Sequence, residues 1–350
     1  MQFIKSGINI DFVGKMKIAF SVSGAMILIS ILSIIFHGGL RYGVDFAGGT
    51  VIQVKFFSPV STEDVKSAIA GLGDLGLGGN ASVQRFGEKN ENEYLIHTDK
   101  AETSDEKFSK ELETKLKNAV KADVEIRRIE IVGPQVGKDL REKALFAIFY
   151  SLLLIAIYIS GRFESQWIKS GIMAGVLIFC VYTVSNFGFS IPILILTALM
   201  ITLVLFWFLQ LKYAMGAIVA LIHDVTITIG LFSLFDKEVS LPIIAAILTI
   251  IGYSLNDTII VYDRIRENLK KYQKLSLKEM INRSVNETLS RTILTSGTTL
   301  ITVVALLILG GGIIHDFAFA MTAGIVVGTY SSVYVASPIL ILWQERDRRK

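Results

Sequence analysis

Residues 18–36 read IAFSVSGAMILISILSIIF, and none of these nineteen side chains carries a charge. A helix rises about 1.5 Å per residue, so a run of this length is close to the ~30 Å thickness of a bilayer hydrocarbon core. It also exceeds the apolar region of a signal peptide, which is about 7–15 residues long. Lys15 and Lys17 precede the run, and no small-residue cleavage pattern follows it. We therefore predict a retained first transmembrane helix.

Further apolar runs follow along the chain, which is 52% hydrophobic and has a mean hydropathy of +0.55. They cover residues 144–160, 171–209, 213–235, 239–262, 292–314 and 317–343. As a single helix, the 171–209 run would extend about 58 Å, roughly twice the thickness of a bilayer core. Its residues 186–192 (NFGFSIP) contain the turn-forming residues at which we expect it to reverse direction. The sequence therefore predicts a polytopic α-helical membrane protein with about eight spans.

Basic residues gather on one side of these predicted spans. The predicted cytoplasmic segments contain Lys5, Lys15, Lys17, Arg162, Lys169, Lys212, eight basic residues from Arg264 to Arg291, and the C-terminal Arg346, Arg348, Arg349 and Lys350. The short loops on the other side contain only Lys237. Because Lys and Arg in short loops collect on the cytoplasmic side, we expect both termini there and residues 37–137 outside.

The segment between the first two spans has the periodicity of a soluble domain. Strands are predicted at 50–57, 81–86, 94–98 and 124–132, and helices at 61–72 and 104–120. This β-α-β-β-α-β order is that of a ferredoxin-like domain, with two helices on one face of an antiparallel sheet. The predicted organisation is thus an N-terminus and first span at 1–36, one external α+β domain at 37–137, and a membrane domain at 138–350.

Motifs for catalysis or cofactor binding are missing from the sequence. It has no Walker-type loop, metal-ligand spacing or nucleophile triad, and its one cysteine, Cys180, lies in an apolar run. The net charge of +4 is modest for a membrane protein and gives no reason to expect nucleic-acid binding. We expect neither an enzyme nor a protein that holds a cofactor or a metal ion.

Seven short motifs carry a resemblance to a known family. They are YGVDFAGGT at 42–50, VGPQVG at 132–137, RFE at 162–164, HDV at 223–225, GYSLNDT at 252–258, DRIREN at 263–268 and SRTILTS at 290–296. In this order, and at these positions relative to the predicted spans, they resemble the SecD and SecF protein-export subunits. The single small external domain makes the chain more similar to SecF than to SecD, whose external domain is much larger.

The resemblance implies a bacterial inner-membrane subunit of the Sec translocase, within the resistance-nodulation-division superfamily. Such a subunit pairs with SecD, associates with the SecYEG channel, with YajC and YidC as further partners, and uses the proton-motive force to assist export of unfolded polypeptides. Family members of this type normally have six spans. About 45 extra residues precede Lys212 here, and we interpret residues 167–209 as an inserted helix pair. The pair is either a partial duplication, because 171–205 loosely resembles 216–249, or a chance similarity between apolar helices.

Two ionisable residues are predicted to form a proton relay. Asp257 lies in the 239–262 run, and Arg291 opens the 292–314 run at about the same depth. A buried carboxyl group that gains and loses a cationic neighbour can bind and release a proton. By the resemblance, both residues match family positions implicated in proton conduction. A fixed ion pair that joins two helices is the alternative.

Other polar residues accompany this pair within the predicted spans. The candidate supporting residues are Ser254, Asn256, Thr258, Thr295 and Ser296, together with His223 and Asp224 in the 213–235 run. They would supply hydrogen bonds or hold water along a proton path, but small hydroxyl residues also promote close helix packing. For His223 and Asp224, a second polar step and a plain contact between helices are equally open interpretations.

A basic segment at 263–291 is expected to lie outside the spans on the cytoplasmic side. Residues 276–279 (SLKE) fit a capping box, and apolar residues follow them at helical spacing. We predict an amphipathic helix that rests on membrane lipid at the inner surface.

Two alternatives to proton-driven export stay open. A non-conducting scaffold would bind emerging chains through its external domain and use the polar residues of the spans only for packing. A small-molecule efflux protein of the same superfamily would need roughly twelve spans and two large external loops, and this chain has one such loop.

Overall fold

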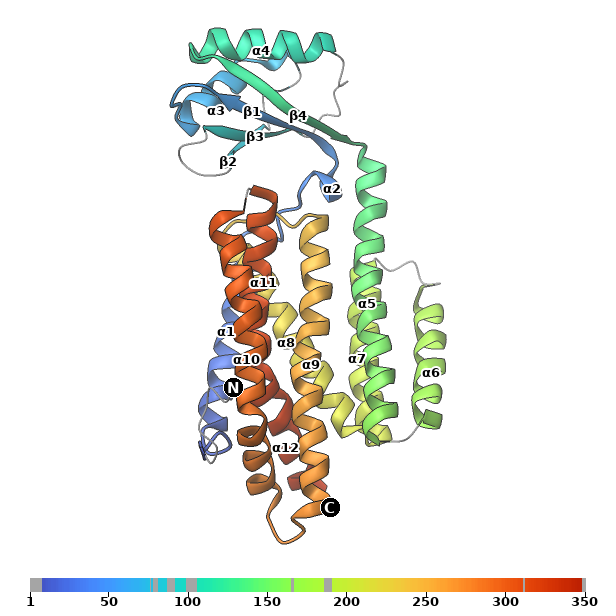
Figure 1. Ribbon diagram of the computed structural model, residues 1–350. Helices are drawn as coiled ribbons and strands as arrows, with labels where there is room; N and C mark the ends of the chain where they lie inside the picture. Colours follow the sequence, from blue (N-terminus) through green and yellow to red (C-terminus); the bar gives the residue numbers. More distant parts are fainter. Residues whose placement is uncertain are drawn as a thin grey trace.

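The computed structural model describes residues 8–75, 77, 81–86, 92–98, 106–164, 167–185, 191–310 and 312–347. It consists of a long helical bundle with a small α/β domain at one end (Figure 1). The first helix, α1 (Met16–Phe36), leads towards this domain, and the chain returns to the bundle through α5 (Pro134–Glu164). The predicted domain boundary at 137/138 therefore falls in the first turn of α5.

The α/β domain has the predicted order of strands and helices. It comprises α2 (Val44–Ala47), β1 (Gly49–Phe56), α3 (Thr62–Ala70), a 3-10 turn (Gly73–Leu75), β2 (Ser82–Phe86), β3 (Glu93–Thr98), α4 (Glu106–Val120) and β4 (Val124–Val132). The strands form one antiparallel sheet in the order β2-β3-β1-β4. Alternate residues of β1, Ile52, Val54 and Phe56, share a core with Leu112 and Leu116 of α4, because successive strand side chains point to opposite faces.

Glycines allow the α/β domain to pack closely against the start of α5. Gly48, between α2 and β1, has a φ of +77°, where an L side chain would be strained. A Cβ atom there would lie 2.7 Å from Cα of Pro134, and one at Gly137 would lie 2.9 Å from the Gly48 nitrogen. The glycine motifs at 42–50 and 132–137 thus meet in one joint, from which β4 leads directly into α5.

Six helical segments of the described chain are long and apolar enough to cross a membrane. They are α1, α5, α8 (Lys212–Leu234), α9 (Leu241–Lys271), α10 (Leu277–Leu309) and a last segment in which α11 (Gly312–Ser331), a π-helical turn (Ser332–Ala336) and α12 (Ser337–Asp347) follow one another. Each of the six contains most or all of one predicted apolar run.

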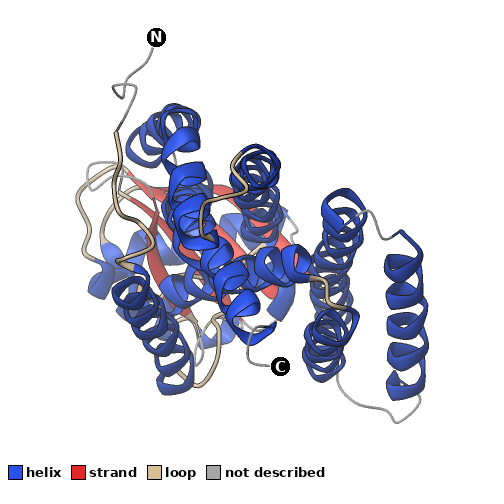
Figure 2. Cartoon of the chain, turned by 90° about the horizontal axis from the view of Figure 1, so that it is seen from below, coloured by secondary structure: helices blue, strands red, loops and turns tan. Residues whose placement is uncertain are grey.

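The predicted insertion forms two helices beside these segments. α6 (Trp167–Ser185) and α7 (Ile191–Leu209) pack against each other and against α5, and α7 also contacts α8. Figure 2 shows α5, α6 and α7 as a group at the side of the other helices. The break predicted at 186–192 falls mainly on residues outside those described. The apolar stretches of both helices are shorter than the six segments above, so a total of eight spans stays a prediction.

The structure differs from the prediction for residues 263–291. This fully described segment holds no separate amphipathic helix, because its residues belong to the end of α9, a turn at 272–276 and the first turns of α10. The predicted capping box is present: Glu279 N donates to Ser276 Oγ at 3.3 Å, and the Glu279 carboxylate accepts from Ser276 N at 2.9 Å. The helices continue past the apolar runs because Lys, Arg and Glu are good helix formers.

Candidate functional site

Small residues bring α9 and α11 into close contact inside the bundle. A Cβ atom at Gly324 of α11 would lie 2.3 Å from Ile250 Cδ1, and one at Gly328 would lie 2.9 Å from Ser254 Cβ. α8 packs against both of these helices. In lipid, close approach of helices and hydrogen bonds between them stabilise packing, since the surroundings are as apolar as the helices. The polar side chains of α8, α9 and α11 therefore meet inside the bundle.

Asp224 of α8 is fully buried where these helices meet. Its Oδ2 accepts hydrogen bonds from Ser254 Oγ of α9 at 2.5 Å and from Ser331 Oγ of α11 at 2.8 Å. Its Oδ1 lies 2.8 Å from Nδ1 of His223, the preceding residue. Ser331 comes directly before the π-helical turn, an irregularity that is frequent at functional sites. Three polar side chains thus converge on one carboxyl group.

His223 links this carboxyl group to α1. Its Nε2 lies 3.1 Å from Ser23 Oγ, and Ser23 Oγ lies 3.2 Å from the hydroxyl oxygen of Tyr330 on α11. The Tyr330 hydroxyl donates to the carbonyl oxygen of Ala19 at 2.7 Å. The chain of contacts therefore runs from α8 through α1 to α11.

Asp257 of α9 has a simpler environment, although it is only 1% exposed. Its Oδ2 accepts a hydrogen bond from Ser296 Oγ of α10 at 3.0 Å. Ser296 Oγ in turn accepts one from Thr329 Oγ1 of α11 at 2.9 Å. The carboxyl group thus has one hydroxyl donor, and that donor belongs to a neighbouring helix.

Arg291 and Asp257 do not form the fixed ion pair of the alternative interpretation. In the described part of the chain the Arg291 side chain is exposed on α10 and makes no ion pair, although it is close enough for its charge to act on Asp257. One turn further along α10, Thr295 is turned to its own helix and donates to the carbonyl oxygen of Arg291 at 3.0 Å. The predicted relay residues therefore lie on facing helices without direct contact.

The other predicted residues divide between the two carboxyl groups. Ser254 and His223 contact Asp224, and Ser296 contacts Asp257. Thr258 is buried beside Asp257 in the sequence, whereas Asn256 lies on the exposed face of α9. Sequence reasoning did not identify Ser23, Tyr330, Ser331 or Thr329. Ser23, Ser30 and Ser33 are buried on one face of an otherwise apolar α1, so their spacing was a usable signal.

A second polar cluster lies where the α/β domain meets the bundle, outside the membrane-spanning segments. Glu238, in the loop between α8 and α9, lies 3.6 Å from His97 Nδ1 of β3 and accepts a hydrogen bond from Gln84 Nε2 of β2 at 3.2 Å. Burial raises the pKa of Glu238 to about 7, and burial, helped by Arg41, lowers the pKa of His97 to about 4. A cavity of about 1120 Å³ adjoins this cluster, between the sheet and the loops of the bundle.

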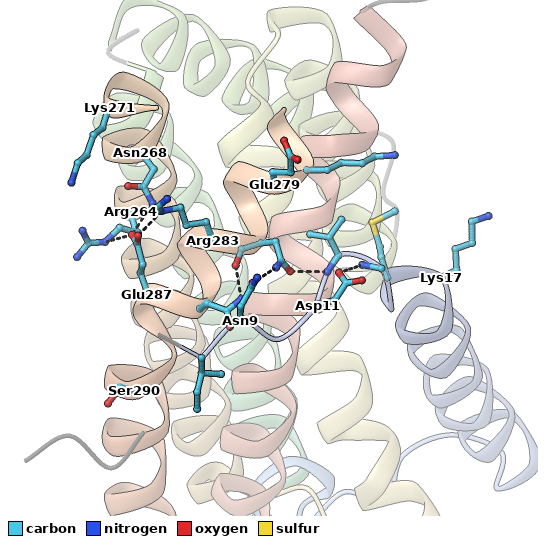
Figure 3. A pocket seen from close by; sticks show the side chains of 17 residues that line it. Asn9, Asp11, Lys17, Arg264, Asn268, Lys271, Glu279, Arg283, Glu287 and Ser290 are labelled. Atoms are coloured by element: carbon cyan, nitrogen blue, oxygen red, sulfur yellow. Dashed lines mark hydrogen bonds and ion pairs between the residues drawn. The ribbon is translucent and has the colours of Figure 1, made fainter. Parts of the chain in front are cut away.

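A polar cavity of about 1080 Å³ lies at the opposite end of the bundle (Figure 3). Asn282 and Asn286 of α10 hold the segment that precedes α1 by its backbone: Asn286 Oδ1 accepts from Ile10 N at 2.8 Å, and Asn282 Oδ1 accepts from Phe12 N at 2.8 Å. Two of the five cationic lining residues, Arg264 and Arg283, contact Glu287. The cavity lies where the N-terminal segment is held against α10.

Comparison with protein families gives two matches. The family described as protein export membrane protein SecD/SecF, C-terminal, matches residues 111–201 and 189–346. The SecD/SecF GG motif matches residues 33–60, which include the glycine motif packed against α5. The two matches to the C-terminal family overlap in and just before α7.

Individual relatives agree with this result. The chain is 40% identical to the protein translocase subunit SecF of Calditerrivibrio nitroreducens over 358 residues, which cover 100% of this chain and 99% of the relative. It is 39% identical to the same subunit of Vibrio alginolyticus over 340 residues, which cover 97% and 91% of the two chains.

Solved structures give the same picture at the level of the fold. The crystal structure of SecDF, a translocon-associated membrane protein from Thermus thermophilus, matches with a TM-score of 0.69 and 32% identity over 97% of this chain. A SecDF structure in a super-membrane-facing form matches with a TM-score of 0.58 and 30% identity over 100% of this chain. This chain spans 39% and 40% of those two SecDF chains.

Proposed function

Because this chain belongs to the SecF family of the SecD/SecF protein-export membrane proteins, we propose that it uses the proton-motive force, together with SecD, to assist protein export through the Sec channel. The family gives it a role in protein transport rather than catalysis, and SecD as its partner. The use of protons, the SecYEG channel, YajC, YidC and unfolded polypeptides as further partners belong to the proposal.

The environment of Asp257 is the observation that most supports proton use. Among the residues that the structure describes, its buried carboxyl group has a single hydroxyl donor, Ser296, and no cation in contact with it. A carboxylate inside a membrane costs at least about 2.5–3.5 kcal/mol on insertion scales, so it must find a partner or carry a proton. Arg291, free on the neighbouring α10, is the partner that it can gain or lose. A shift between α9 and α10 would thus exchange a proton for a cationic neighbour.

The proposed arrangement in the cell follows from the charge distribution along the chain. The protein lies in the bacterial inner membrane with both termini in the cytoplasm, and the ferredoxin-like α/β domain lies on the outer side. The α6–α7 pair crosses the membrane twice and brings the number of spans to eight. An even number of inserted spans keeps α8 to α12 in the orientation of a six-span relative.

Replacing Asp257 by Asn tests proton use directly. Vesicles that contain this chain, SecD and the channel are given a proton gradient, and export of a precursor protein into them is measured with and without it. We expect Asp257→Asn to abolish the gradient-dependent part of export. Asp263→Asn is the matched control, because Asp263 is exposed and pairs with Arg162 at 2.7 Å. Full gradient dependence in Asp257→Asn would favour the non-conducting scaffold.

Cysteine labelling tests the arrangement in the membrane. In a Cys180→Ser background, single cysteines replace Lys117 of α4, Lys271 at the end of α9, or Asn186 between α6 and α7. A membrane-impermeant thiol reagent added to spheroplasts should label the first and third positions and leave the second unlabelled. A cysteine at 186 that is labelled only after lysis would contradict the eight-span arrangement.

A further inference from the structure

His223 and Asp224 form a buried titratable pair that the proposed relay does not use. They are 3% and 0% exposed, and they contact α1, α9 and α11 through hydroxyl groups only. The other buried carboxyl group of the described bundle is Asp257, three residues after Ser254 on α9. Two tyrosines also lie near the pair, Tyr330 of α11, whose ring stacks on His223, and Tyr334 of the π-helical turn, whose ring contacts Tyr330.

The hydrogen atoms around Asp224 can be counted from the contacts of its two oxygen atoms. Ser254 and Ser331 each have one hydroxyl hydrogen to donate to Oδ2, and Ser254 makes no other hydrogen bond in the described structure. Ser331 Oγ also lies 3.1 Å from the carbonyl oxygen of Gly328, so its hydrogen is shared between two acceptors. Oδ1 faces Nδ1 of His223 at 2.8 Å. An ionised carboxylate accepts from all three groups, and Nδ1 then carries a hydrogen.

The hydrogen atoms on the other side of His223 are counted in the same way. The carbonyl oxygen of Ala19 only accepts, so the single hydroxyl hydrogen of Tyr330 points to it. The Tyr330 oxygen can therefore only accept from Ser23, which lies 3.2 Å away. Ser23 has one hydrogen, but both Tyr330 and Nε2 of His223 are within reach of it.

The protonation state of His223 decides where the Ser23 hydrogen goes. If Nε2 is bare, Ser23 donates to it, and no hydrogen lies between the oxygens of Ser23 and Tyr330. If Nε2 carries a hydrogen, His223 donates to Ser23, Ser23 donates to Tyr330, and Tyr330 donates to Ala19, so every contact becomes a hydrogen bond. The ring of Tyr330 also stacks on His223, with centroids 6.1 Å apart, and an aromatic face attracts a cation at about this distance.

We propose that His223 and Asp224 form a second proton-binding site, in which Nε2 of His223 takes up a proton and Ser23 turns in response. With the proton bound, the pair is an imidazolium and a carboxylate with no net charge; without it, the pair carries one negative charge. Each proton exchange makes or breaks the hydrogen bond from Ser23 of α1 to Tyr330 of α11, while the one from Tyr330 to Ala19 persists. The coupling of this exchange to export rests on the proposed function, but the occupancy of the site does not.

Nitrogen-15 magnetic resonance of histidine-labelled protein tests the proposal. The full chain is reconstituted with SecD in lipid nanodiscs, and its four histidines, His37, His97, His223 and His315, give few signals to assign. We expect one buried imidazolium signal that disappears in His223→Gln and converts to the neutral form as the pH is raised. Neutral histidine signals alone from pH 5 to 9, or an imidazolium that persists in His223→Gln, would overturn the proposal.

Two further variants keep the test decisive if His223→Gln fails to fold. Tyr330→Phe keeps the ring but removes the acceptor that competes for the Ser23 hydrogen, so Ser23 donates to Nε2 and the imidazolium signal should fall at least tenfold at pH 7. Thr329→Val, which removes a neighbouring hydroxyl outside this chain of contacts, should leave the signal unchanged. Equal signals in Tyr330→Phe and the wild type would contradict the proposed role of Ser23.

Proton-driven export and the second proton-binding site can be overturned independently of each other. Asp257→Asn should leave the His223 signal and its titration in place, whatever it does to export. A titrating His223 in a protein whose export ignores the proton gradient would overturn the proposed function alone. A gradient-dependent protein whose His223 stays neutral would overturn the second site alone.

Discussion

Asp224 and Asp257 are buried to the same degree on neighbouring helices, but they are held very differently. Asp224 receives contacts from α8, α9 and α11 through His223, Ser254 and Ser331. Asp257 receives one hydrogen bond, from Ser296 of α10. A carboxyl group with three partners is fixed in position and charge, whereas one with a single partner can change its neighbour at little cost. The number of partners, and not burial, therefore distinguishes the two carboxyl groups.

Truncating the two carboxyl groups should separate them most strongly. Asp224→Ala leaves Nδ1 of His223 and the Ser254 hydroxyl without their partner and leaves Ser331 with only the carbonyl oxygen of Gly328, so we expect a loss of about 3 kcal/mol in the free energy of unfolding. Asp257→Ala removes one acceptor and should cost about 1 kcal/mol. Reversible unfolding of the purified chain in detergent measures both. Equal losses would remove the proposed distinction.

Filling the contact between α9 and α11 should disturb the Asp224 side of the comparison. A methyl group at Gly328 would lie 2.9 Å from Ser254 Cβ, so Gly328→Ala should lower the stability by about 1–3 kcal/mol. The control is Gly252 of α9, where a Cβ atom would meet nothing within 4 Å. Gly252→Ala should be neutral or gain up to about 1 kcal/mol, because alanine favours a helix more than glycine does. A smaller loss in Gly328→Ala than in Gly252→Ala would contradict the packing described above.

A third, partly buried carboxyl group, that of Glu238, extends the comparison to pH. Its pKa rises from 4.5 to about 7 on folding, so its contribution to stability is complete below pH 4.5 and is lost as the pH rises through about 7. The pKa of His97 falls from 6.5 to about 4, so its contribution is present above pH 6.5 and is lost as the pH falls through about 4. Between pH 4.5 and 6.5 the two groups change the stability in opposite directions as the pH rises. Above pH 6.5 only Glu238 still makes the stability depend on pH.

As the pH rises from 6.5 to 8, the Glu238→Gln variant should therefore lose less stability than the wild type. The thermal midpoint of the purified chain, followed over this range in both proteins, measures the difference. The same comparison from pH 6 down to pH 4 should show a steeper loss in Glu238→Gln, because the opposing slope is gone. Parallel curves over the whole range would show that the contact between Glu238 and the α/β domain does not titrate.

A surface carboxylate should show the smallest effect. Asp263 pairs with Arg162, but their side chains are 46% and 42% exposed. Asp263→Asn should change the free energy of unfolding by less than about 1 kcal/mol, because water and salt screen an exposed pair. Unfolding at low and at high salt checks this value. If Asp263→Asn lowered the free energy of unfolding as much as Asp257→Ala, the exposure of a carboxyl group would not predict its contribution to stability.

Hydropathy located the buried carboxyl groups, because a charge within an apolar run is visible in the sequence. It could not assign their partners. Arg291 and Ser296 both lie near the depth of Asp257, but five residues along a helix turn a side chain by about 140°, so only one of the two can point to Asp257. That one is Ser296. The same helical rotation explains Asn256. It stands between Ser254 and Asp257 in the sequence, but its side chain lies on the exposed face of α9.

The fold was predicted best where local signals decide it. The strands begin and end within one residue of their predicted bounds, because alternation and turn residues mark them. α5 extends beyond its apolar run at both ends, α9 at its C-terminal end and α10 at its N-terminal end, since hydropathy reports the bilayer and not the last helical hydrogen bond. The contacts of Ser23 and Tyr330 with His223 could not be predicted, because they form only through the packing of α1 and α11 against α8.

The direct passage from β4 into α5 has a mechanical consequence. Gly133 alone separates the last residue of the strand from Pro134, and the Gly48 and Gly137 contacts brace the joint. α5 has 31 residues and is therefore about 46 Å long. A lever of this length converts a tilt of 5° at its far end into a displacement of about 4 Å at the sheet. Small rearrangements among the helices are thus magnified where the α/β domain stands.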